Sequence, residues 1–345
     1  MIRAFFKVLL VIACWTLVWQ VRQGACAEAP AASARASTEE SATDSSAATA
    51  LDEVPTSDLH LYVLPEADVL EGPPQSFVDL DHYHSADSYG SPVDNWRWQV
   101  LPAGLVYRSY LASTKEPRLG AQVVNASDWG WVLDGILGAR VGLLRYGTTD
   151  PIWPDGFEIQ AEGAAQLRLD IPHDVDLGSV DFRAGMPIVF GVGPVRTKLG
   201  YYHLSSHVGD EFLLRHPDFD RLNYARDCLM LGHSLNITPW WRLYAEADWA
   251  FYSDVGDPWE FQFGADYEAP GPTGLHGAPF FGINGHLRQE LDFNGALTVQ
   301  AGWSWRNPGG QLLRMGLQYY NGATNQLSFY RENEEQIGFG LWYDF

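Results

Sequence analysis

Long stretches of alternating apolar and polar residues fill the last two thirds of this 345-residue chain, and they constrain its fold more than any other feature. Between 156 and 171 one parity is apolar or small, and the other is mostly charged or amidic. Successive side chains of a β-strand point to opposite faces, so each stretch predicts a strand with one apolar and one polar face. The pattern recurs at 241–253, 258–269 and 295–306.

Three features favour a membrane-spanning barrel over a soluble sandwich, whose strands alternate but turn the apolar face inward. The stretches have about 10 to 15 residues, whereas ordinary strands have about 5 or 6 and bilayer-spanning strands about 9 to 11. The last strand is aromatic and ends on Phe345, which is similar to the assembly signal of outer-membrane barrels. Aromatic residues gather at strand ends, where interfacial girdles lie, namely Trp240, Trp241, Trp303, Trp305, Tyr319 and Tyr320.

We therefore expect an all-β, antiparallel up-and-down transmembrane β-barrel of about 12 strands over 118–345, because single-chain bacterial barrels have even strand numbers. Both barrel ends then lie on the periplasmic side, with short turns there and 209–223 as an external loop. The expected strands are 118–125, 136–147, 156–171, 178–190, 194–208, 224–237, 241–253, 258–269, 279–292, 295–306, 310–321 and 334–345.

The first 27 residues are typical of a signal peptide, with a basic start, an apolar core and a small-residue cleavage site around Cys26. A retained anchor and lipid attachment at Cys26 are the alternatives. Loss of the leader removes Arg3, Lys7 and Arg22 and takes the net charge from −21 to −24. Such an acidic chain disfavours nucleic acid as a partner, because phosphates need cationic counter-charge. Only Cys228 then remains, so no intrachain disulfide is possible.

Two further segments precede the barrel. Residues 28–57 are rich in small and acidic residues and have no aromatic residue, which predicts a disordered linker. Residues 58–117 mix aromatic residues with proline and are expected to form an irregular plug or seal at the barrel mouth. Within them His82 and His84 indicate either a cation site or a solvated acidic loop, and the loop is favoured. We expect no metal and no cofactor, since the chain carries no such motif.

The polar parity of the strands is expected to face the barrel lumen. Its acidic residues indicate either a cation-preferring passage or a closed interior of mutually bonded charges. The predicted lumen-lining residues are Arg196, Lys198, Glu246, Asp248, Glu260 and Asp266.

Several stretches resemble the domain-of-unknown-function family number 1207, found in bacteria with outer membranes. The most specific stretch is Tyr-Tyr-His-Leu-Ser-Ser-His-Val-Gly-Asp-Glu-Phe at 201–212. The others are Leu-Pro-Ala-Gly-Leu-Val-Tyr-Arg-Ser-Tyr-Leu-Ala at 101–112, Lys-Glu-Pro-Arg-Leu at 115–119, Arg-Leu-Tyr-Ala-Glu-Ala at 242–247 and Gly-Phe-Gly-Leu-Trp-Tyr-Asp-Phe at 338–345. The resemblance covers roughly 60–345. It implies an outer-membrane barrel, and it brings no established activity and no catalytic residues.

His203 and Ser205 are the strongest candidates for chemistry, since alternate residues of a strand share one face. A His that accepts the Ser proton is the minimum for nucleophilic hydrolysis. The His-x-Ser spacing is similar to that of outer-membrane phospholipase A and the lipid A deacylases, although those enzymes continue with Asn where this chain has Ser206. The pair is otherwise a polar rim that bonds to the loop. Candidates for the orienting third residue are Asp227, Asn223 and Asp210.

The favoured interpretation is a non-enzymatic protein of the cell outer membrane, either a narrow channel or a structural envelope protein. Its expected partners are outer-membrane lipid and the barrel-assembly machinery, which would recognise the C-terminal strand that ends at Phe345. The alternative is an outer-membrane lipid or ester hydrolase that uses His203, Ser205 and Asp227 at the outer rim.

Overall fold

The computed structural model describes residues 96–345. The predicted signal peptide (1–27), the predicted linker (28–57), His82, His84 and most of the 58–117 segment lie outside the described residues. No helix within 96–345 is long and apolar enough to span a membrane.

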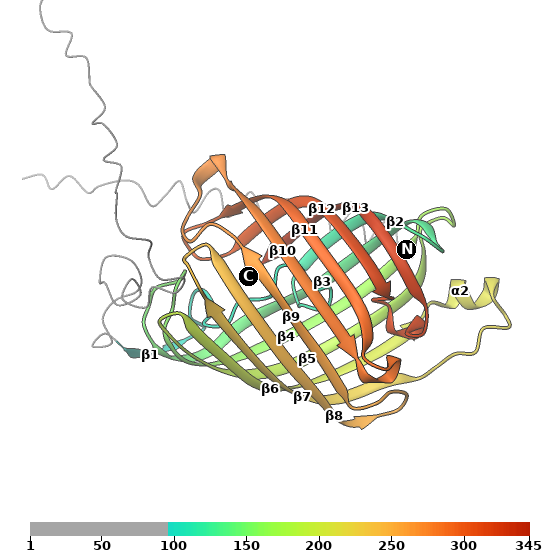
Figure 1. The fold of residues 1–345 in the computed structure, drawn as a ribbon, viewed down its shortest axis with the longest axis horizontal. Helices are drawn as coiled ribbons and strands as arrows, with labels where there is room; N and C mark the ends of the chain where they lie inside the picture. The colour runs from blue at the N-terminus through green and yellow to red at the C-terminus, as the bar shows by residue number, and fades with distance from the viewer. Residues whose placement is uncertain (1–95) are drawn as a thin grey trace, which may run out of the picture. The chain divides into compact units, whose positions relative to one another are not determined.

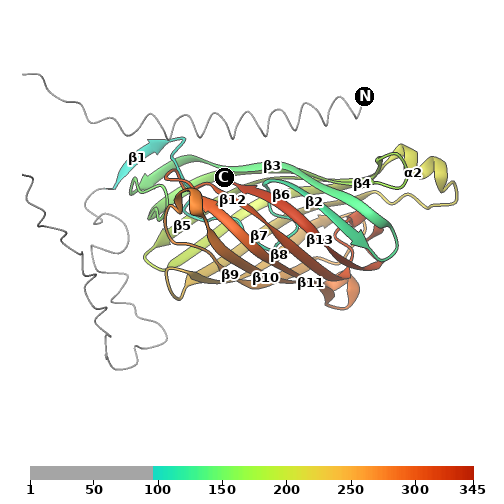
Figure 2. The same cartoon turned by 90° about the horizontal axis from the view of Figure 1, so that it is seen from above.

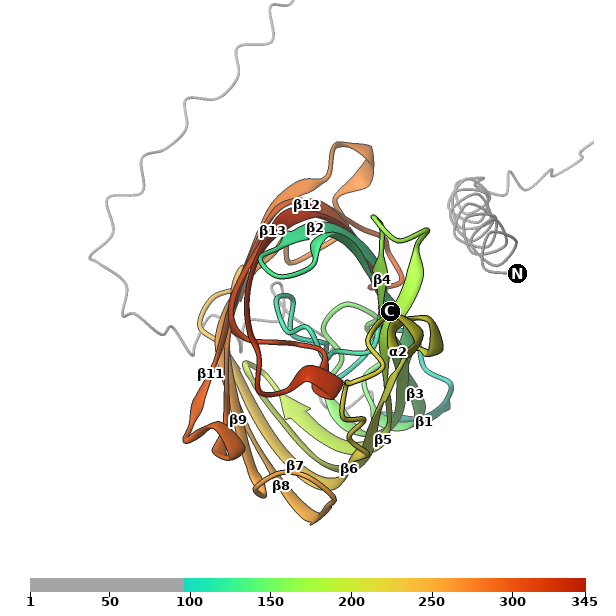
Figure 3. The same ribbon diagram turned by 90° about the vertical axis from the view of Figure 1, so that its right-hand side faces the viewer.

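Twelve antiparallel strands form a closed barrel, which confirms the predicted fold class and strand number (Figures 1 and 3). Each strand pairs with its neighbours in sequence, and β2 closes the ring by pairing with β13. The strands of the ring are β2 (Leu119–Ala126), β3 (Gly130–Gly147), β4 (Gly156–Asp170), β5 (Asp176–Val192), β6 (Val195–Val208), β7 (Tyr224–Asn236), β8 (Trp241–Ser253), β9 (Trp259–Tyr267), β10 (Ala278–Arg288), β11 (Asn294–Arg306), β12 (Leu312–Ala323) and β13 (Asn333–Asp344).

The observed strand bounds differ most from the predicted ones at two hairpins. β3 begins at 130 rather than 136, because Gly130 adopts φ 70° and completes a tight turn there. β10 ends at 288 rather than 292, because the chain forms the short 3-10 helix η4 (Gln289–Leu291). Asp292 then adopts a left-handed conformation with φ 56° before β11 begins.

The apolar parity of the strands faces outward, and the polar parity faces the barrel interior. On β6, the side chains of Arg196 and Lys198 are buried, whereas Leu199 on the same strand is 57% exposed. A soluble sandwich buries its apolar face instead, so this arrangement excludes that alternative. Large aromatic residues also lie exposed on the outside, among them Trp131, Trp241, Trp249, Trp259, Phe263 and Trp303.

The chain enters the barrel interior between β1 (Arg97–Val100) and β2. The sequence pattern does not predict β1, which pairs with the last residues of β3, from Arg97 opposite Gly147 to Val100 opposite Leu144. Residues 101–118, called the inner segment below, then run inside the ring, as the teal trace in Figure 3 shows. The buried side chains of the inner segment include Leu105, Val106, Tyr107, Tyr110, Leu111 and Ala112.

The two ends of the barrel differ in their connections. The tight turns at 193–194, 237–240 and 307–311 define a turn end, which also carries η3 (Gly274–His276) in a longer connection. The opposite loop end carries α2 (Asp210–Arg215) in the 209–223 loop, far from β1 (Figure 2). It also carries η5 (Leu327–Phe329), whose three residues are buried because the 324–332 connection folds back into the ring (Figure 3).

Candidate functional site

The barrel interior holds all the charged residues that were expected to line a lumen. Each of them lies on the inner face of its strand and is at most 8% exposed. The surrounding wall carries further buried arginines, including Arg140, Arg145, Arg168, Arg226, Arg242 and Arg314.

These interior residues contact other protein groups, five of them in ion pairs and Asp248 through a tyrosine hydroxyl. Lys198 Nζ lies 2.6 Å from Glu246 Oε2, and the Tyr202 hydroxyl donates to Asp248 Oδ2 at 3.0 Å. Arg196 Nη2 lies 3.0 Å from Asp155 at the turn end. Buried charges are tolerated where partners and hydrogen bonds compensate their lost hydration. Glu260 and Asp266, the last two predicted residues, have such partners. They form the ion pairs Arg226–Glu260 and Arg242–Asp266.

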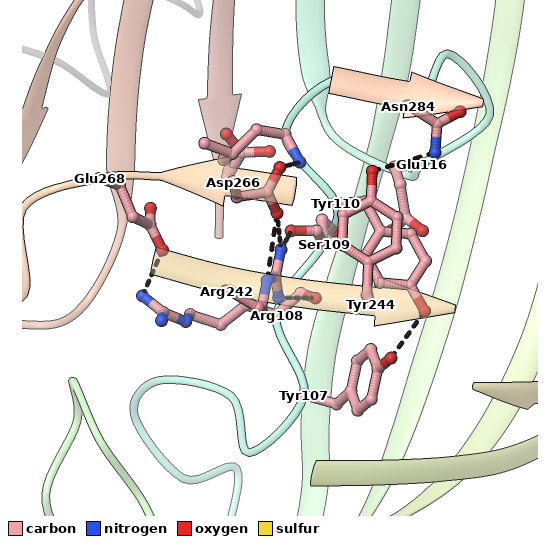
Figure 4. A network of polar contacts seen from close by, with 12 residues as sticks. Tyr107, Arg108, Ser109, Tyr110, Glu116, Arg242, Tyr244, Asp266, Glu268 and Asn284 are labelled. Carbon is pink, nitrogen blue, oxygen red and sulfur yellow. Dashed lines mark hydrogen bonds and ion pairs between the residues drawn. The ribbon is translucent and has the colours of Figure 1, made fainter. Parts of the chain in front are cut away.

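Wall arginines bind the backbone of the inner segment. The two terminal nitrogens of Arg242 donate to the carbonyls of Arg108 at 2.9 Å and Ser109 at 2.6 Å (Figure 4). Arg314 on β12 donates to the carbonyl of Leu111 at 3.2 Å, and Arg118, at the end of the inner segment itself, donates to the same carbonyl at 2.7 Å. The backbone of the inner segment therefore finds in the wall the hydrogen bonds that it would otherwise make with water.

The side chains of the inner segment also match the wall. Tyr110 stacks on Tyr244 with ring centroids 3.8 Å apart and donates to Glu246 at 2.7 Å. Arg108 Nη1 lies 2.8 Å from Glu268 Oε1, and Figure 4 marks this ion pair with a dashed line. The other charged residues of the segment have wall partners too, in the pairs Lys115–Asp181, Glu116–Arg140 and Arg118–Asp344.

The 324–332 connection closes the interior towards the loop end. Leu327 N donates to Asp181, and Ser328 Oγ lies 2.6 Å from Ser206 Oγ on β6. Two small cavities lie in the described part of the barrel, and each has room for about one water. The inner segment and the 324–332 connection occupy the described interior between them.

The outer face of the barrel carries the candidate catalytic residues. Asp227 pairs with His203 across β6 and β7, and its Oδ1 lies 2.9 Å from His203 Nδ1. The Tyr201 hydroxyl donates to the same oxygen at 2.6 Å. Ser205 lies opposite Ala225, and within 96–345 no hydrogen bond joins its hydroxyl to His203. The other candidates lie apart from the pair, since Asn223 bonds to Asp254 and Asp210 begins α2.

Glu290, in η4 at the loop end, is a buried carboxyl outside the strands. Its side chain lies 3.3 Å from Arg288 and accepts a hydrogen bond from Tyr224 at 3.1 Å. Burial, together with the nearby Glu260 carboxylate, raises the pKa of Glu290 from 4.5 to about 7. Because the folded state holds this proton more tightly than the unfolded chain, the resulting stability is full below about pH 4.5 and is lost as the pH rises through 7.

We expect Glu290→Gln to flatten the pH dependence of stability between pH 5 and 8. The shift corresponds to at most about 3 kcal/mol, which the amide variant does not lose on alkalinisation. The measurement is the urea midpoint in lipid vesicles at several pH values. Glu335→Gln is the matched control, since Glu335 also accepts a tyrosine hydroxyl, from Tyr319 at 2.9 Å, but is exposed. Equal slopes in the wild type and Glu290→Gln would refute the assignment.

The family model described as "Protein of unknown function (DUF1207)" matches residues 99–345. The chain belongs to this family. The match confirms the resemblance that the 101–112 and 201–212 stretches indicated. No curated protein matches the chain.

Two solved barrels illustrate what the chain is similar to in overall fold. One is the Salmonella typhi outer membrane phospholipase (OMPLA) dimer with bound calcium, at 12% identity and a TM-score of 0.46, over 68% of this chain and 93% of that one. The other is the KdgM porin in complex with disordered oligogalacturonate, at 10% identity and a TM-score of 0.39, over 66% and 98%. These similarities are too weak to carry a function.

Sequence reasoning did not find the contacts of two parts of the site. Residues 58–117 were expected to plug or seal the barrel mouth, but the wall partners of the inner segment were not predicted, because the segment shows no strand periodicity. Arg168 on β4 is the second, since it bonds to Asp134 and also to Glu334 from β13. Its position on the polar parity of 156–171 was visible, but its partner on a distant strand was not.

Proposed function

We propose that this protein is a non-enzymatic outer-membrane barrel with a sealed interior, and that it serves the envelope as a structural protein rather than as an open channel. Its exposed outer face is apolar, as a lipid-facing surface requires, and aromatic residues are spread over that face. Its partners would be the lipids that surround the barrel.

The binding of the inner segment is the observation that carries this proposal. From the wall, Arg242 and Arg314 hold its backbone at Arg108, Ser109 and Leu111. An ion channel needs a continuous polar path with sites weak enough to release the ion. Interior charges that are already paired with protein groups leave no such path, so the segment acts as a fixed plug.

The test combines location with conductance. We expect the full chain to fractionate with outer membranes and to show heat-modifiable mobility on gels. Inserted into planar bilayers in that folded form, it should give no discrete conductance steps. Steps that recur at a fixed size in well-inserted protein would show an open channel and overturn the proposal.

Lipid or ester hydrolysis is the second candidate, and the contact of His203 with Asp227 favours it. An acid that holds the imidazole through Nδ1 leaves Nε2 available as a base for a neighbouring hydroxyl. His203 is 45% exposed on the outer face, where acyl chains would reach it. The missing contact is the hydrogen bond from Ser205 that would activate the nucleophile.

We expect no fatty-acid release by the wild type, because Ser205 lacks that hydrogen bond among the described residues. The measurement uses mixed phospholipid and lipopolysaccharide micelles, with and without calcium. Ser205→Ala and Asp227→Asn are the informative variants, and Ser206→Ala on the inner face is the matched control. Release that persists in Ser206→Ala but disappears in the other two variants would establish the hydrolase instead.

A further inference from the structure

One polar pair lies in the middle of the apolar outer face of the barrel. Thr197 on β6 is opposite His233 on β7, and its Oγ1 lies 2.9 Å from His233 Nδ1. Both residues share the outward parity of Leu199 and Leu231, which are more than half exposed. His233 is itself exposed, so its ring faces the surroundings of the barrel rather than the interior.

The height of this pair follows from its neighbour on β8. His233 is opposite Ala245, which lies midway along the strand between Trp241 and Trp249. Both tryptophans are exposed on the outer face, where aromatic rows mark the two membrane interfaces. The strand rise and tilt place Ala245 about 10 Å from each tryptophan along the barrel axis. His233 therefore lies near the middle of the apolar band.

A hydrogen-bonding side chain at this depth sets β6 and β7 apart from the rest of the described ring. Within 96–345 the middle of the outward parity is apolar or small on the other strands, for example at Ala161, Ile188, Phe263, Ile283, Val299, Leu317 and Phe339. Acyl chains neither donate nor accept hydrogen bonds, so a polar group that faces them loses the bonds that it makes in water.

One nitrogen of this pair lacks a partner in the described chain. His233 Nδ1 has the Thr197 hydroxyl, whereas within 96–345 no hydrogen bond reaches His233 Nε2. Lipid cannot supply that bond at the middle of the bilayer, because its polar groups lie at the interfaces. A partner for Nε2 at this depth has to be another protein surface.

A second copy of the chain is complementary to this nitrogen. The Thr197 hydroxyl can donate to Nδ1 or accept from Nδ1–H, so the imidazole can carry its proton on either nitrogen. Nε2–H of one copy can then donate to the bare Nε2 of the other, across a two-fold axis. Ala245 and Ala247 lie beside the histidine, and small residues allow two protein surfaces in a membrane to approach closely.

We propose that two copies of this barrel associate side by side in the membrane through the outer faces of β6, β7 and β8. The two His233 side chains are hydrogen-bonded at the centre of the contact. Leu199, Leu231 and Leu243 surround the histidine and pack against the second copy. The proposal rests on the lipid-facing outer surface of the function proposed above, and it does not depend on whether the interior conducts.

The first test is sedimentation equilibrium of the folded full chain in density-matched detergent. The wild type should sediment as a dimer, and His233→Leu should raise the dimer dissociation constant about tenfold, as the loss of one hydrogen bond inside the membrane implies. Heat-modifiable mobility shows that each sample is a folded barrel. A failure of this test is therefore distinct from a failure of the sealed barrel, which conductance measures.

His207→Leu is the matched control. It makes the same change on the outward parity of β6, but six residues beyond Tyr201 towards the loop end, where water supplies the hydrogen bonds. Its dissociation constant should equal that of the wild type. A wild type that stays monomeric at every concentration, or equal weakening by the two leucine variants, overturns the proposal.

The second test leaves His233 in place and locates the contact. Oxidation with copper phenanthroline in lipid vesicles should link Ala245→Cys into a disulfide-bonded dimer. Ala301→Cys is the matched control, since Ala301 is also an exposed, outward alanine but lies on β11, three strands further round the ring. Cys228, present in both variants, is buried. Equal linking of both variants, or linking of Ala245→Cys to a different protein in native outer membranes, overturns the assignment of a second copy.

Discussion

A chain that begins at Arg118 behind an export signal should form conducting pores, whereas the full chain should give no conductance steps. All twelve strands of the ring lie within 119–344 and keep their pairing, including the closing contact of β2 with β13. The truncation removes β1 and the inner segment, except Arg118, and exposes the interior charges to water. Of the described residues it takes away Arg97, Arg108, Lys115 and Glu116, a net loss of two positive charges, so the pore should prefer cations.

The control for this truncation is a chain that begins at Trp96, which keeps β1 and the inner segment and should stay silent. The 324–332 connection still covers the loop end of the truncated barrel. Replacing 325–331 with a short glycine-rich turn in the same chain should therefore increase the conductance further. If neither truncated form gives conductance steps, although both insert into bilayers and keep heat-modifiable mobility, the inner segment does not close the interior.

The strands were predictable because their signal is local. A period of two needs only the residues of one strand, and at β4 and β8 it gives the element, its faces and nearly its bounds. The same parity assigned Lys198 and Glu246 to one interior before any pairing was known. The number of strands followed from counting such stretches, so the architecture of the barrel could be predicted from the sequence.

The filling of the barrel was not predictable in this way, because it depends on contacts between distant parts of the chain. Arg242 bonds to the carbonyl of Ser109, which lies 133 residues earlier, and Arg314 bonds to the carbonyl of Leu111, which lies 203 residues earlier. Such bonds leave no periodic trace in either segment. Strand register on the outer face was equally hidden from the sequence. Two aspartates and one asparagine were candidates for the partner of His203, and only the pairing of β6 with β7 identifies Asp227.

The Arg168 network is where a single change should cost the barrel most stability. Arg168 is fully buried, and its Nε and Nη2 donate to the two oxygens of Asp134 at 2.8 Å each. Its Nη1 donates to Glu334 at 2.6 Å, so one guanidinium joins β3, β4 and β13. Because β3 and β13 flank β2, these bonds hold the ring together at its closing strand.

Arg168→Met should lower the free energy of unfolding by about 3–5 kcal/mol, because it leaves two buried carboxylates without their cation. The measurement is reversible urea unfolding in lipid vesicles. Arg215→Met is the control, since Arg215 also pairs with two acids, Asp170 and Asp176, but lies 24% exposed in α2. That variant should lose about 1 kcal/mol or less. Adding Asp134→Asn and Glu334→Gln to Arg168→Met should recover much of the lost stability, because these changes remove the two unpaired buried carboxylates. Similar losses in the two arginine variants, or no recovery in the triple variant, would show that the Arg168 ion pairs do not make this contribution to the free energy of unfolding.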